Sequence, residues 1–162
     1  MPTKNIPCRV TDTWTLGDPG FPAIGTRFIR TNPTNANYGE QEWVAVYNDE
    51  AATAFAEGNV IIRDAATLTY DGILSTGTVA AHRVLGVAQH AIAADKCGFI
   101  LARGIGEVLA DGNVTANSPI VSDTAGDATD CTTGTNDYGI FAISSETDAG
   151  ATKVTCHINC PG

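Results

Sequence analysis

The stretch RVLGVAQHAIAADKCGFILARG, Arg83 to Gly104, contains a histidine and a cysteine, the pair that a thiol-dependent catalytic site requires. His90 and Cys97 lie on either side of a predicted turn, so the two side chains could meet in space. The alternative is two apolar strands joined by that turn, with Cys97 filling the turn and His90 at a strand end. We favour the alternative, because the sequence also lacks H-E-x-x-H, G-x-S-x-G and P-loop patterns. The sequence therefore predicts no catalytic residue and a protein that is not an enzyme.

The C-terminal stretch VTCHINCPG raises the question of a zinc site at Cys156, His157 and Cys160. In a strand, both cysteines fall on one face and His157 on the other. The two thiols would be roughly 13 Å apart at ~3.3 Å per residue. The sequence therefore predicts buried free thiols rather than a metal site or a disulfide. The odd number of cysteines, with no C-x-x-C spacing, agrees with this prediction; they are Cys8, Cys97, Cys131, Cys156 and Cys160.

Two further segments could bind a ligand. The acidic stretch SDTAGDATDCTTGTND carries Asp123, Asp127, Asp130 and Asp137, whose spacing misses the EF-hand pattern. A solvated loop is favoured there over a calcium site. The glycines of RGIGEVLADG do not form the G-x-G-x-x-G pattern of dinucleotide-binding proteins. We expect neither a metal ion nor a cofactor.

The elements that would position these residues are short apolar runs separated by turns. We expect strands at residues 8–14, 26–30, 42–47, 59–63, 67–71, 83–89, 98–103, 106–110, 118–122, 138–144 and 152–159. One or two helical turns are expected only at residues 49–58. The predicted fold class is all-β: a single compact β-barrel or β-sandwich, of β-tulip or jelly-roll type, with an extended N-terminal arm.

Composition and charge limit the partners. The chain has 162 residues and a net charge of −9, so neither nucleic acid nor an anionic membrane surface is an expected partner. No apolar run is long enough to span a membrane, and the start MPTKNIPCRVTDTW lacks the apolar core of a signal peptide. We expect folding in a reducing cytoplasm.

The N-terminal segment differs from the rest of the chain. Residues 1–35 include Pro19, Pro22 and Pro33, which favour an extended arm, and residues 36–162 form the β-rich domain. The arm's aromatic residues require an apolar surface, either the chain's own core or a neighbouring subunit. The candidate contact residues are Trp14, Phe21, Arg27, Phe28 and Arg30.

Residues Glu42 to Gly126 resemble the capsid decoration, or cement, proteins of tailed bacteriophages. The likeness rests on a GVA strand, a GF…L…RG strand, the segment GEVLADG, and a T-A-N…V run that ends in a glycine-rich turn. The upstream stretch EWVAVYNDEAATAFAEGNVI is similar to the family's aromatic strand, small-residue segment and following strand. The proline-rich arm and the cysteine-bearing C-terminus do not match.

The resemblance implies a structural virion protein made in the cytoplasm of a host bacterium. It would bind the outer capsid surface as a homo-oligomer, as a trimer, and cement neighbouring subunits of the major capsid protein. A carbohydrate- or receptor-binding β-module of a phage tail or fibre is the alternative function. A small β-fold hydrolase is a third class, for which we find no nucleophile–base pair.

Overall fold

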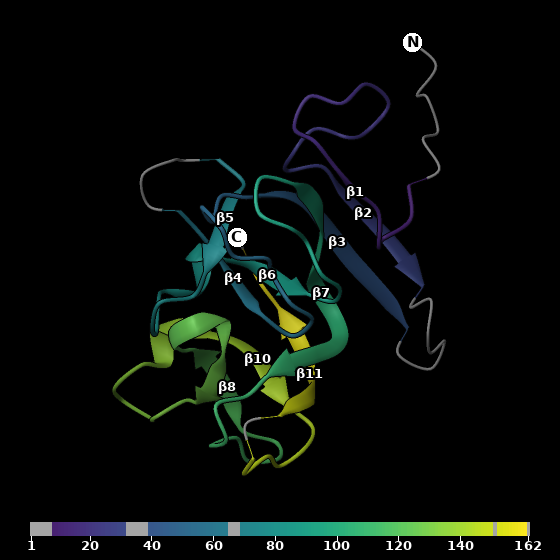
Figure 1. The fold of residues 1–162 in the computed structure, drawn as a ribbon. Coiled ribbons are helices and arrows are strands. Elements are labelled where there is room, and N and C mark those ends of the chain that lie inside the picture. The colour runs from purple at the N-terminus through teal and green to yellow at the C-terminus, as the bar shows by residue number, and fades with distance from the viewer. Residues whose placement is uncertain (1–7, 32–38, 65–68, 151, 162) are drawn as a thin grey trace.

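The computed structural model describes residues 8–31, 39–64, 69–150 and 152–161. Within these residues, eleven strands join into one mixed sheet (Figure 1). They are β1 (Thr13–Trp14), β2 (Arg27–Thr31), β3 (Glu40–Asn48), β4 (Val60–Arg63), β5 (Asp71–Leu74), β6 (Val84–Ala88), β7 (Cys97–Leu109), β8 (Pro119–Ser122), β9 (Ala128–Asp130), β10 (Ile140–Ser144) and β11 (Lys153–Asn159). Three 3₁₀ helices accompany them: η2 (Ala81–Arg83), η3 (Thr124–Gly126) and η4 (Asp137–Gly139). The prediction of an all-β fold is confirmed.

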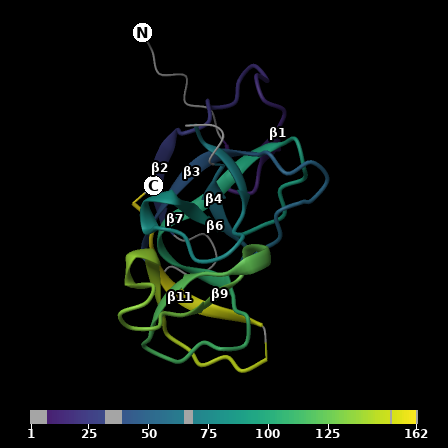
Figure 2. The same cartoon turned by 90° about the vertical axis from the view of Figure 1, so that its left-hand side faces the viewer.

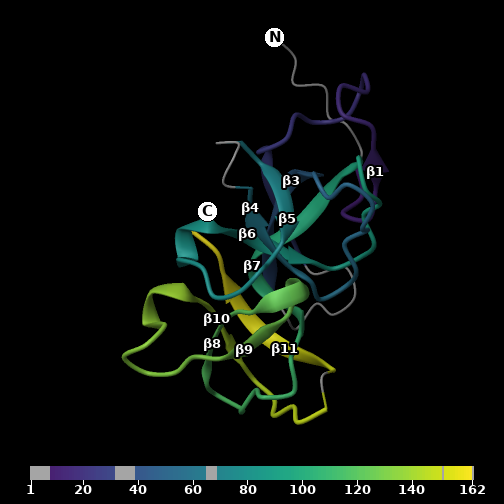
Figure 3. The same ribbon diagram turned by 60° about the vertical axis from the view of Figure 1, so that its left-hand side comes forward.

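The sheet runs in the order β2-β3-β5-β4-β6-β7-β11-β10-β8-β9, with β1 added to β7 and a further pairing between β3 and β7. The pairings are antiparallel except for β3 with β5. In three views, β8, β9 and β10 gather at one end of the molecule and β1 and β2 at the other (Figures 1, 2 and 3). The sheet as a whole is not a closed barrel.

Strands β3 and β7 lie between two apolar clusters, and their sequences explain why. Both contain unbroken apolar runs, WVAV and FILA, which are typical of strands buried on both faces. Phe99 and Leu101 of β7 enter one cluster with Trp43 of β3, while Ile100 enters the other with Val44. β3 and β7 are therefore the central pair around which the remaining strands assemble.

Strand β7 is one continuous element of 13 residues, although the sequence predicts two strands separated at Gly104. Gly104 has φ +117°, and a Cβ atom there would lie 3.0 Å from the Gln41 side chain and from the Glu40 carbonyl. Glycine at this position thus permits a bend and a close approach of β3 without ending the strand (Figure 1). Gly104, which suggests a turn in the sequence, therefore lies inside one long strand.

Other boundaries also differ from the prediction. β1 covers only the end of the stretch predicted at residues 8–14, and β5 begins at Asp71, where the strand predicted at 67–71 ends. Residues 67–68 of that predicted strand lie outside the described residues. β9 was not predicted at all. The helical turn expected at residues 49–58 is wrong: Phe55 forms an isolated bridge with Ile92 and is fully buried.

None of the helices in the described part of the chain has the length and apolar character needed to cross a bilayer.

Candidate functional site

The aromatic residues of the N-terminal segment pack on the chain's own core. Trp14 stacks on Phe21, with ring centroids 5.2 Å apart, and also contacts Phe99 of β7 at 4.9 Å. Phe28 meets the Phe99 ring edge-on at 4.8 Å. Trp14 is 4% exposed, so most of its surface is already covered within the chain. Of the two surfaces considered for the arm, the structure provides the chain's own core for Trp14 and Phe28.

The backbone of the same segment belongs to the sheet. β1 pairs with Gly98 and Cys97 of β7, and β2 pairs along its whole length with β3. Within residues 8–31 the segment is therefore part of the folded body. The boundary predicted at residue 35 lies outside the described residues.

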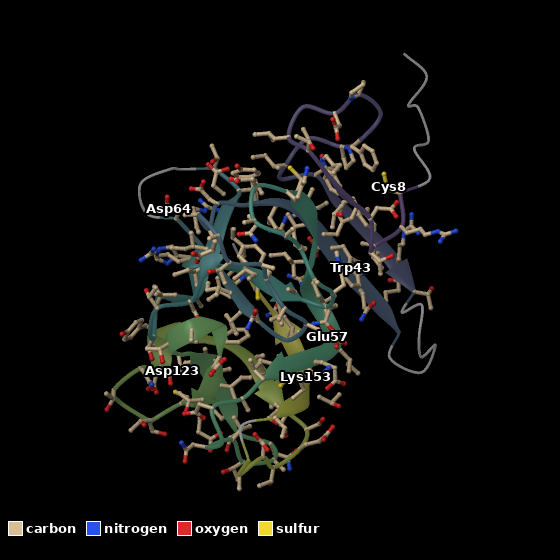
Figure 4. The ribbon with its side chains drawn as sticks, in the orientation of Figure 1. Cys8, Trp43, Glu57, Asp64, Asp123 and Lys153 are labelled. Carbon is tan, nitrogen blue, oxygen red and sulfur yellow. The ribbon has the colours of Figure 1, made fainter. Side chains whose placement is uncertain are left out.

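The two arginines of β2 differ in their partners. Arg27 forms an ion pair with Glu42 of β3 at 2.7 Å. Arg30 lies over the Phe28 ring, 5.2 Å from its centroid, and donates a hydrogen bond to the carbonyl of Cys8. Cys8 is drawn close to β2 in Figure 4. Four of the five predicted contact residues, Trp14, Phe21, Phe28 and Arg30, are thus brought together around Phe99, which the sequence did not indicate. Arg27 lies on the opposite face of β2 and pairs with Glu42 instead.

Three apolar side chains of the same segment remain exposed. Leu16, Phe21 and Ile29 are 54%, 37% and 63% exposed, respectively. A pocket of about 380 Å³ is lined by Trp14, Leu16, Gly17, Asp18, Phe21, Pro22, Ala23 and Ile24. Leu16 and Ile29 were absent from the predicted contact residues, although alternation along TRFIR places Ile29 on the face opposite Phe28. We call Leu16, Phe21 and Ile29 the apolar patch.

A second open surface lies at the other end of the molecule. Tyr138 and Ile143 are more than half exposed. A pocket of about 390 Å³ is lined by Ile105, Asn117, Ile143, Ser144, Ser145, Glu146, Thr155, Cys156 and His157. This surface could not be predicted from the sequence beyond the position of Ile143 among alternating residues of β10.

The pair that suggested thiol chemistry is held by other contacts. Nδ1 and Nε2 of the His90 ring lie 3.0 and 3.2 Å from the carbonyl oxygens of Ala91 and Phe99. Cys97 begins β7 and is fully buried. Burial, followed by the nearby Asp18 and Asp71 carboxylates, raises the pKa of the Cys97 thiol to about 11. A thiol with so high a pKa is protonated at neutral pH, which opposes a role as nucleophile.

The C-terminal thiols lie as the strand pattern predicts. Cys156 and Ile158 are fully buried and Cys160 is 2% exposed, whereas His157 is exposed on the opposite face. All five cysteines are free. Burial raises the pKa of Cys156 to about 12 and that of Cys160 further. The predictions of buried free thiols and of separate faces for His157 and the cysteines are confirmed.

The acidic stretch predicted as a loop contains β9 and is ordered by its own side chains. Asp130 accepts a hydrogen bond from the backbone N–H of Thr115, and Asp137 accepts one from Gly134. Burial, followed by Asp111 and Asp123, raises the pKa of Asp127. Among the residues that the structure describes, no group of three or more His, Cys, Asp or Glu side chains is placed to hold a metal ion.

Comparison with protein-family models and with curated proteins gives no match. Among solved structures, the chain is similar to the N base of the head fiber gp8.5 in bacteriophage phi29. The TM-score is 0.51 and the sequence identity 9%, over 72% of this chain and 92% of that chain. At this identity the likeness concerns the fold.

Proposed function

We propose that this chain is a structural virion protein of a bacteriophage head. The fold likeness to the base of a phage head fiber supports the proposal most directly. The sequence resemblance to capsid decoration proteins points to the same class of particle by a separate route.

Within that class, we propose that the chain binds the outer capsid surface as a homotrimer and fastens neighbouring subunits of the major capsid protein. Free energy gained only in the assembled shell would shift its disassembly without affecting the folding of each subunit. A trimer that makes three capsid contacts at once would gain avidity even if each contact is weak. The apolar patch is the proposed contact surface, because its three large apolar side chains are exposed in the folded chain.

The test uses DNA-filled heads of the phage that encodes this chain, prepared with and without the protein. Full-length protein should co-sediment with expanded heads and raise the temperature at which they release packaged DNA. Light scattering on the free protein should give a mass near three chains. Equal release temperatures with and without bound protein would contradict the cement role.

The apolar patch is tested by point changes rather than by removing residues 1–35. Such a deletion would remove β1, β2 and Trp14, so loss of binding would only report loss of folding. Leu16→Ser and Ile29→Ser should weaken head binding while the chain stays folded, and Tyr138→Ser at the other end of the molecule is the matched control. Weaker binding of the control alone would move the contact surface to the opposite end.

The alternative is a base module that carries a carbohydrate- or receptor-binding fibre, and the head-fiber neighbour is the observation that favours it. A head-bound chain that leaves DNA release unchanged but is required for adsorption to cells would support this alternative. Titration of the purified protein with host surface glycans distinguishes direct recognition from a purely mechanical base.

A further inference from the structure

The two strands at the ends of the sheet order, β2 and β9, differ in whether another segment covers their outer edge. At one end, Ala110 bridges Ala128 of β9, and the backbone N–H of Asp111 donates to the Ala128 carbonyl at 2.9 Å. The N–H of Asp130 donates to the Asn113 carbonyl. At the other end, β2 has β3 as its strand partner and no second strand follows it in the sheet order. β2 is therefore the open edge within the described residues.

The register shows which backbone groups of β2 point outward. The N–H of Ala45 donates to the Thr26 carbonyl, and the N–H of Gly25, at φ +84°, donates to the Ala45 carbonyl, which is the pattern of a bulge containing a left-handed glycine. Ala45 thus directs its backbone toward β2. By alternation along the antiparallel pair, Phe28 and Arg30 bond to β3, while the N–H and C=O of Ile29 and Thr31 point away from it.

The side chains of Ile29 and Arg30 indicate which residues a strand bound at this edge would carry. Ile29 is 63% exposed and offers an aliphatic contact. The ion pairs within 4.0 Å among the described residues are Arg27–Glu42 and Lys153–Glu57, so Arg30 has no carboxylate partner there. Its guanidinium is nevertheless positioned by the Phe28 ring and the Cys8 carbonyl, and retains further N–H donors. A carboxylate opposite Arg30 would complete the site.

We propose that β2 binds an extended, acidic segment of a partner polypeptide by strand addition, with an aliphatic residue opposite Ile29 and a carboxylate opposite Arg30. Backbone hydrogen bonds supply affinity in this mode and the alternating side chains supply selectivity. A second copy of the chain fits poorly, because two adjacent β2 strands would bring four arginines together against two Glu42 carboxylates. The inference concerns the edge alone and does not depend on the virion role.

The first experiment titrates the ¹⁵N-labelled protein with the blocked peptide Thr-Thr-Glu-Val-Thr-Val-Thr, which places glutamate opposite Arg30 and valine opposite Ile29 in an antiparallel pair. The amide signals of Ile29 and Thr31 should shift, and their hydrogen exchange should slow. The same peptide with lysine in place of glutamate should bind about tenfold more weakly, as expected for loss of one charge-assisted pair. Equal binding of both peptides, or protection located elsewhere, would overturn the proposal.

Variants separate the backbone contribution from the side-chain contribution. Ile29→Pro removes an outward N–H without removing a hydrogen bond to β3, so it should abolish peptide binding, whereas Ile29→Ala should only weaken it. Arg30→Glu should reverse the preference, so that the lysine peptide binds more tightly. If Ile29→Pro fails to fold, the Arg30→Glu variant still tests the proposal. An unchanged preference in Arg30→Glu refutes the charge requirement.

A concentration series of the free protein tests the competing occupant. If β2 pairs with β2 of a second copy, exchange at Ile29 will slow as the protein concentration rises, and the proposal of an acidic partner strand is then wrong. If Ile29 exchanges at a constant rate and slows only with the glutamate peptide, the open edge and its selectivity are both supported.

Discussion

Residues 8–105 and residues 106–161 differ in aromatic content and in net charge. Nine of the eleven aromatic residues precede residue 106, and the ring–ring contacts at Trp14 and Phe99 lie in that region. Residues 1–105 carry eight basic and ten acidic residues, a net charge of −2, whereas residues 106–162 carry one basic and eight acidic residues, a net charge of −7. The ring–ring contacts among the described residues all lie in the first region, whereas the second region carries most of the molecule's negative charge.

Turns in the second region are fixed by carboxylates and amides that accept backbone hydrogen bonds. Asp148 is 8% exposed and accepts bonds from the N–H of Gly150, at 3.0 Å, and of Thr152, at 2.9 Å. The backbone of Asp148 also bridges Val114. The ion pair between Lys153 and Glu57 links the regions (Figure 4). Side chains that cap turns can thus give a highly charged region with short strands a defined shape.

The largest predicted effect is at Phe99. Phe99→Ala removes a fully buried ring that contacts both Trp14 and Phe28, and should lower the free energy of unfolding by about 3–5 kcal/mol in urea denaturation. Phe141→Ala, at a similarly buried ring with no ring partner among the described residues, should cost about 1 kcal/mol less. Equal losses would show that ring pairing does not distinguish the regions.

An intermediate effect is expected at Asp148. Asp148→Ala leaves the N–H groups of Gly150 and Thr152 and the Thr152 hydroxyl without their acceptor, which should cost about 1–3 kcal/mol. Asp148→Asn keeps one acceptor oxygen and should cost less. Hydrogen exchange should quicken at Val114, which pairs with the Asp148 backbone. Exchange that quickens instead at β1 and β2 would contradict the assignment of this turn to the second region.

The smallest effect is expected at Asp127, where the substitution should increase the free energy of unfolding rather than lower it. Burial, followed by Asp111 and Asp123, raises the pKa of Asp127 above the unfolded value of 3.8, so the folded chain holds its proton more tightly. The resulting stability is present below that value and is lost as the pH rises through the folded pKa. Asp127→Asn should therefore stabilise the chain slightly near neutral pH, and the gain should shrink toward pH 3.8. A gain independent of pH would exclude this charge effect.

Many of the strands can be predicted from two sequence patterns, unbroken apolar runs and alternation of apolar with polar residues. WVAV of β3 and FILA of β7 predict strands, and alternation in VTCHINC predicts the buried face of β11. The merging of two predicted strands into β7 could not be read from the sequence, because glycine is compatible with both a turn and a bend. Phe55 was misplaced for a related reason: small residues around it permit a helix, but its burial beside Ile92 decides the conformation.

The sequence analysis predicted several residues of the candidate site, but not how they are arranged or which of them are exposed. Composition identified Trp14, Phe21 and Phe28 as needing an apolar partner, yet only the tertiary structure shows that Phe99 is that partner for two of them. The exposed residues Leu16 and Ile29 could be recognised only once the inward-facing side was known. The same limit applies to Arg27 and Arg30, which are alike in the sequence and differ because only Arg27 forms an ion pair with Glu42.

The long strand β7 also determines the order in which the chain can complete its fold during synthesis. Its partners range from β1, at residues 13–14, to β11, at residues 153–159. β3, β6 and β7 can pair as soon as residue 109 has left the ribosome, but one face of β7 still lacks Cys156 and Ile158. A nascent chain that stalls before β11 would expose that face and seven unpaired positions of β7 to other nascent chains. We therefore expect synthesis of β11 to protect this part of β7 from contact with other chains.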